Sequence, residues 1–175
     1  MPFANINADP AVMECFPYTL TASESDAFIQ RIEAHFERHG FGLYAVELRE
    51  SGQLAGFVGL LVPSFEAPFT PCVEIGWRLA RRFWGRGFAT EGARYVLDYG
   101  FDRIGLSEIV SFTVPANVRS IAVMERLGMK RDLNGDFDHP LIPQGHPLQR
   151  HVLYRLSKAN REAQTGASEH RVESR

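Results

Sequence analysis

A short glycine-rich turn between a strand pattern and a helix pattern constrains the fold of this chain most strongly. The turn reads Arg-Phe-Trp-Gly-Arg-Gly over residues 82–87. Residues 73–79, just before it, alternate between apolar and polar side chains, as is typical of a strand. Residues 89–101, just after it, place their apolar side chains on one helical stripe. The sequence therefore predicts a strand, a tight turn and a helix in direct succession.

A second strand pattern, over residues 109–114, completes a strand-helix-strand unit. Such crossovers are right-handed and place their two strands in parallel, with the turn at the carboxyl end of the first strand. The first amides of a helix have no partner within it and attract anions. We therefore expect the turn to bind a phosphate group.

Positive charge is concentrated around this turn, although the chain has a formal net charge of -2. Four arginines lie in or beside it: Arg78, Arg81, Arg82 and Arg86. A solvated arginine-rich surface and a nucleic-acid interface with stacking aromatic residues are the alternative interpretations. The acidic balance of the chain and the lack of a recognised nucleic-acid module argue against nucleic acid.

Two familiar phosphate-binding loops do not match this turn. A Walker loop needs Lys-Ser/Thr after its last glycine, whereas Gly87 is followed by Phe88 and Ala89. The glycine spacing also departs from the Gly-x-Gly-x-x-Gly pattern of dinucleotide-binding folds. The turn is therefore neither a Walker loop nor a dinucleotide-binding loop.

Residues 82–91, Arg-Phe-Trp-Gly-Arg-Gly-Phe-Ala-Thr-Glu, resemble the acetyl-coenzyme A (acetyl-CoA) loop of GCN5-related N-acetyltransferases, the GNAT superfamily. Residues 74–79, 117–120 and 125–129 resemble the RimJ/RimL-type branch of that superfamily. The match extends from about residue 16 to residue 156. The resemblance implies an α/β (α+β) fold with a mixed central sheet, splayed at the acetyl-CoA site and covered by helices on both faces.

The resemblance also implies an acetyl-CoA site. The amides of the turn would hold the pyrophosphate, and the preceding strand would pair with the pantetheine arm. Asn117 would face the cofactor and is also a residue type that caps helices. The implied cofactor-binding residues are Ile75, Trp77, Leu79, Arg82, Gly85, Arg86, Gly87, Phe88, Ala89, Thr90 and Asn117.

Catalysis in this superfamily is direct attack of a free amine on the thioester. Glu74, on the strand face opposite Val73 and Ile75, is our candidate for the base that accepts the amine proton. Its alternative role is that of a strand glutamate at the sheet surface. Many relatives place a tyrosine, as proton donor to the thiolate, where this chain has Met124. Ser120 is our candidate donor, with Tyr154 or water as alternatives.

The function implied by the resemblance is acetyl transfer to a primary amine, either a protein N-terminus or a small molecule. The alternative is an acyl-CoA-binding module with little or no catalysis, favoured by Met124 and by a possible missing N-terminal strand. The variable segments carry four acidic residues, which favour a cationic acceptor: Glu66, Asp132, Asp136 and Asp138. The expected partners are acetyl-CoA and the amine acceptor, and neither nucleic acid nor a membrane is expected. The protein itself is expected to be a monomer or a homodimer.

Composition and patterning predict one domain over residues 1–157 and a polar, disordered tail over 158–175. Cys15 and Cys72 form no paired motif, which favours a cytoplasmic location. The histidines at 139, 146 and 151 match no common zinc spacing, so no metal site is expected, and they are assigned to loop ordering or substrate contact.

The remaining patterns predict a helix over 23–39 and strands over 43–48, 54–62 and 151–156. The last of these should pair near the strand at 108–114.

Overall fold

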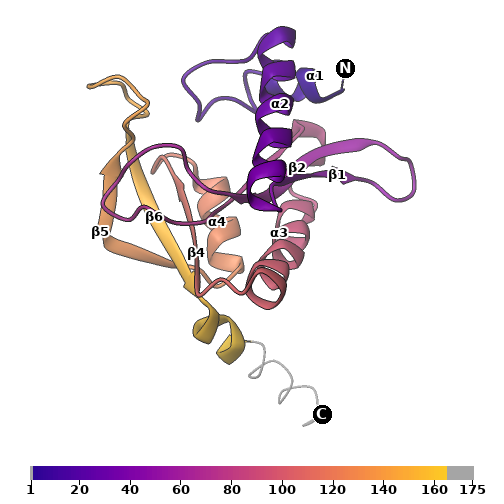
Figure 1. Ribbon diagram of the computed structural model, residues 1–175. Helices are drawn as coiled ribbons and strands as arrows, with labels where there is room; N and C mark the ends of the chain where they lie inside the picture. Colours follow the sequence, from indigo (N-terminus) through magenta and orange to yellow (C-terminus); the bar gives the residue numbers. More distant parts are fainter. Residues whose placement is uncertain (1, 165–175) are drawn as a thin grey trace.

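The computed structural model describes residues 2–164, and within them six strands form one mixed sheet in the order β1-β2-β3-β4-β6-β5 (Figure 1). β3 and β4 run parallel, and the other neighbouring pairs run antiparallel. The strands are β1 (Leu43–Glu47), β2 (Leu54–Leu61), β3 (Glu74–Leu79), β4 (Glu108–Thr113), β5 (Lys130–Asp138) and β6 (Arg150–Ser157). The expected fold class is confirmed.

Helices cover both faces of this sheet, as expected. They are α1 (Pro2–Ala8), α2 (Ala22–His39), α3 (Phe88–Tyr99) and α4 (Val118–Arg126), with short helical segments at η1 (Arg81–Phe83) and η2 (Gly100–Ile104). Phe3 and Phe28, from α1 and α2, pack on Phe57 of β2. The next residue, Val58, faces α3, where a Cβ on Gly92 would lie 2.9 Å from it. Consecutive strand residues point to opposite faces, so α1 and α2 lie opposite α3.

The bounds of α2 follow from its capping residues. Thr21 accepts a hydrogen bond from the Glu24 amide, and the Glu24 carboxylate accepts one from the Thr21 amide. This reciprocal capping box satisfies two free amides and begins the helix at Ala22. Gly40 ends it in the left-handed conformation, with φ 74°. The helix predicted over 23–39 is confirmed.

The sheet separates between its two parallel strands. Glu74 pairs with Val110, and the Val110 amide donates to the Val73 carbonyl at 2.9 Å. Beyond this point, the Ser111 hydroxyl spans the gap to the Ile75 carbonyl at 2.9 Å. On its other side β4 pairs with β6 along its whole length, as predicted for the closing strand. The fork between β3 and β4 is the splay that the resemblance implied.

The expected disorder from residue 158 onward is wrong for residues 158–164, which are helical. Arg161 donates to the Asp98 carboxylate on α3 through Nε and Nη2, at 3.1 and 2.7 Å. This charge pairing orders a segment that composition alone marks as polar. The rest of the predicted tail lies outside the described residues.

Within residues 2–164, no strand precedes α1. None of the helices there has both the length and the apolar character needed to cross a membrane.

Candidate active site

The glycine-rich turn forms an open cradle of amides at the start of α3. Gly85 and Gly87 have φ of 72° and 84°, and a Cβ at either position would meet nothing within 4 Å. The first backbone hydrogen bond of α3 runs from Glu91 to Gly87, at 2.9 Å. Within the described residues, the amides of 85–90 donate to no protein group. An anion seated here would be bound by these amides and by the helix dipole.

A cavity of about 1250 Å³ extends from this cradle past the fork of β3 and β4 to the loop between α1 and α2. Pockets for one small ligand usually measure about 300 to 1,000 Å³. The volume therefore leaves room for two substrates. Ten of the predicted site residues line it: Glu74, Trp77, Leu79, Gly85, Gly87, Phe88, Ala89, Thr90, Asn117 and Ser120.

Three predicted site residues do not line this cavity. The side chain of Ile75 is fully buried in the core. Arg82 and Arg86 are exposed, and their guanidinium groups stack on Phe83 and Phe88 at 4.7 and 4.9 Å. Phe83 and Phe88 themselves line the cavity, so the two guanidinium groups lie close to its edge. The role of Arg82 and Arg86 at the phosphate site stays a prediction.

Glu74 lines the cavity at the fork, half-buried, and burial raises the pKa of its carboxyl to about 8. Its Oε1 lies 3.8 Å from the point where a Cβ on Gly76 would be, and apart from Gly76 and its two chain neighbours no other residue comes within 4 Å of that point. Open space therefore lies above Gly76, directly beside the carboxylate. An amine in that space would be within reach of a base with a pKa in the neutral range.

Asn117 caps α4, with its Oδ1 accepting from the Ser120 amide at 3.2 Å and its Nδ2 donating to the Thr113 hydroxyl at 2.9 Å. Both Asn117 and Ser120 also line the cavity. Met124 is 1% exposed. Tyr154 lies in the core and is not among the lining residues, whereas Ser120 is, so Ser120 stays our candidate proton donor.

An aromatic wall, formed by Phe112, His139 and His151, closes the end of the cavity beside β4 and β6. The two imidazole centroids lie 5.0 Å apart. Burial lowers the pKa of both histidines, that of His139 to about 4 with a further contribution from His151. Both are therefore neutral at pH 7. Sequence spacing alone could not bring these two histidines together, because they meet through the pairing of β5 with β6.

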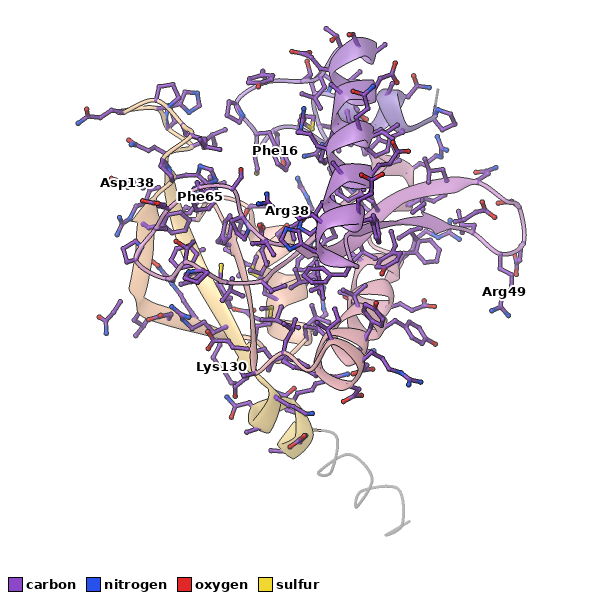
Figure 2. The ribbon with its side chains drawn as sticks, in the orientation of Figure 1. Phe16, Arg38, Arg49, Phe65, Lys130 and Asp138 are labelled. Atoms are coloured by element: carbon purple, nitrogen blue, oxygen red, sulfur yellow. The ribbon has the colours of Figure 1, made fainter. Side chains whose placement is uncertain are left out.

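The acidic residues that suggested a cationic acceptor do not face the cavity. Asp132, Asp136 and Asp138 form ion pairs with Arg155, Arg131 and Arg150. Figure 2 shows Asp138 at the outer edge of the molecule. Neither Glu66 nor the loop at 63–71 that carries it lines the cavity. These four residues therefore give no support to a cationic acceptor, and the charge of the acceptor stays a prediction.

Within residues 2–164, no group of three or more His, Cys, Asp or Glu side chains is arranged to hold a metal ion.

Comparison with known proteins matches a family model described as an acetyltransferase (GNAT) domain to residues 1–130. Protein YkkB of Bacillus subtilis (strain 168) is 31% identical over 121 residues, which are 69% of this chain and 69% of that protein. FsC-acetyl coenzyme A-N(2)-transacetylase of Aspergillus fumigatus is 32% identical over 134 residues, 71% of this chain and 55% of that protein. The crystal structure of a GNAT-family acetyltransferase from Bacillus anthracis matches with a TM-score of 0.72 at 24% sequence identity. This match covers 90% of this chain and 88% of the Bacillus anthracis chain.

Proposed function

Because the chain belongs to the GNAT family and is an N-acetyltransferase of that type, we propose that it transfers an acetyl group from acetyl-CoA to a primary amine by direct attack on the thioester. The observation that carries this proposal is the single cavity that contains the amide cradle, the strand fork and Glu74. GNAT acetyltransferases use acetyl-CoA as donor.

The residues present fit this donor. The free amides of 85–90 suit its pyrophosphate, and the fork offers backbone groups of β3 to the amides of its pantetheine arm. That placement would bring the thioester to the fork, beside Glu74. Ile75 would contribute through its backbone, since its side chain is in the core. Asn117 would contribute the Nδ2 hydrogen that its bond to Thr113 leaves free.

In the proposed reaction, the amine nitrogen attacks the carbonyl carbon, a C–N bond forms and the C–S bond breaks. Glu74 accepts the proton lost by the amine, and Ser120 or water protonates the departing thiolate. A thiol has a pKa of about 8.5, so the thiolate leaves without a strong acid. A base of pKa about 8 is matched to an α-amine of pKa about 7.7 to 8.0 more closely than to a lysine amine of about 10.4.

The resemblance to the RimJ/RimL-type branch supports a protein N-terminal amine as acceptor, with a small-molecule amine as the other class.

The test is release of thiol from acetyl-CoA by the purified protein with a panel of amines. Acceleration by at least one amine, with formation of its amide, is the expected result. The opposing hypothesis is an acyl-CoA-binding module, and it predicts acetyl-CoA binding without amine-dependent thiol release. Ser120→Ala tests the proton donor, since a role for its hydroxyl predicts lower kcat at an unchanged KM for acetyl-CoA. Unimpaired turnover would assign the proton to water.

A further inference from the structure

Arg78 is a cation held among aromatic rings on the wall of the cavity. The guanidinium carbon lies 4.2 Å from the ring centroid of Phe16, 5.3 Å from that of Phe57 and 5.7 Å from that of Phe28. Its Nη1 donates to Oδ1 of Asn7, which is fully buried, at 2.8 Å. Burial lowers the pKa of this guanidinium to about 10, where it still carries its charge at neutral pH.

No carboxylate neutralises this charge within residues 2–164. The ion pairs there involve other arginines, and Arg78 Nε is buried without a hydrogen-bond partner. A desolvated cation without a counter-ion destabilises a fold. An apolar side chain of similar length would fill the same aromatic site without that cost. The charge therefore has a use other than stability.

The position of Arg78 points to the acceptor rather than to the donor. Glu74, Gly76 and Arg78 alternate along β3 and share one face. Arg78 pairs with Phe57 across β2 and β3, and its contacts come from β2, α1, α2 and the loop between those two helices. None comes from the cradle at 85–90. The Cα atoms of Glu74 and Arg78 are separated by about 13 Å at the usual strand rise, a distance that their side chains shorten.

Resting on the proposed acetyl transfer, we infer that Arg78 binds a carboxylate of the acceptor, so that the substrate is an amine that also carries a carboxylate. A guanidinium matches a carboxylate through two parallel hydrogen bonds, and these charge-assisted bonds are stronger than neutral ones. The amine would lie above Gly76 beside Glu74, and the carboxylate would lie toward Phe16. Phe16 and Leu141 also line the cavity, and a non-polar part of the substrate would pack on such side chains.

The test compares amino acids and ω-amino acids of increasing length with their methyl esters, using acetylation by the wild-type protein. At the best spacing, the carboxylate form should exceed its ester in kcat/KM by about 10- to 100-fold, the usual effect of losing a charge-assisted hydrogen bond. Arg78→Gln should remove this preference, and Arg78→Lys should keep part of it. Arg49→Gln removes one charge at the exposed tip of the β1–β2 turn, far from Phe16 in Figure 2, and should change nothing.

Calorimetric binding of the N-acetylated acids, in the presence of coenzyme A, separates the two proposals. Arg78-dependent binding without turnover of any amine would overturn the proposed function and leave only the carboxylate site at Arg78 standing. Equal turnover of acids and esters by the wild type would overturn the inference and leave the function standing. A higher KM for acetyl-CoA in Arg78→Gln, without loss of acid preference, would assign Arg78 to a phosphate of the donor and overturn the inference.

Discussion

Glu74 of β3 pairs with Val110 of β4 at the point where these two parallel strands begin to separate. The carboxyl therefore lies at the fork and lines the cavity, with a pKa raised to about 8 by burial. A group at this position is next to any ligand that enters between the strands.

Glu74→Gln should lower kcat by about 100-fold or more, because a positioned base contributes roughly that factor. In the wild type, kcat should rise tenfold per pH unit up to about pH 8 and then level, since only the deprotonated carboxylate accepts a proton. An acceptor whose amine has a pKa well below 7 isolates the titration of the enzyme. The variant should lose the rising limb at an unchanged KM for acetyl-CoA. An unaltered pH profile would remove Glu74 from the mechanism.

Gly87→Ala should raise the KM for acetyl-CoA about tenfold. At φ 84°, a Cβ is strained by about 1 to 2 kcal/mol and also enters the amide cradle. Gly52→Ala is the matched control, because Gly52 has φ 64° and equally open surroundings but lies in the turn between β1 and β2. Both variants should lose similar thermal stability. If they also had the same KM, the cradle would not be the donor site.

Asn117→Ala should cost about 1 kcal/mol of unfolding free energy through loss of the α4 cap. It should also weaken coenzyme A binding, measured by calorimetry. Thr21→Ala removes the corresponding cap of α2 and serves as the control for a purely structural effect. Equal coenzyme A affinity in the two variants would restrict Asn117 to capping.

His139→Phe should make the protein less sensitive to acid. The pKa of His139 falls from 6.5 to about 4 on folding, so the folded state binds fewer protons than the unfolded state between these values. Its contribution to stability is complete above pH 6.5 and is lost as pH falls toward 4. Between pH 7.5 and pH 5, the melting temperature of the wild type should therefore fall by more than that of the variant. A constant difference, or an NMR titration of His139 near 6.5, would contradict this expectation.

Sequence reasoning succeeded where structure depends on neighbours along the chain. Alternation placed β3, the apolar stripe placed α3, and Gly85 and Gly87 marked a turn that needs positive φ. The closing strand at 151–156 was also predicted, with its pairing near the strand at 108–114, and β6 does pair with β4. Each of these features is set by residues within a few positions of one another or by a known topology.

The chemistry of the acceptor side was not predictable in this way. In the sequence, Asp132 and Asp138 favoured a cationic acceptor. In the structure they form ion pairs with Arg155 and Arg150 and do not line the cavity. Arg78 was grouped with the arginines of the turn, although it faces the other end of the cavity. Phe16 and Asn7, which surround it, lie more than sixty residues earlier in the chain.

By itself, the sequence determined the strand, turn and helix that form the amide cradle, because hydrogen bonding and hydrophobic periodicity there are local. Only the tertiary structure decided which side chains line the end of the cavity near Phe16 and which charges are neutralised. Those outcomes depend on the packing of α1 and α2 on the sheet and on the pairing of β5 with β6. The segments that meet in these contacts cannot be recognised as neighbours from local sequence patterns.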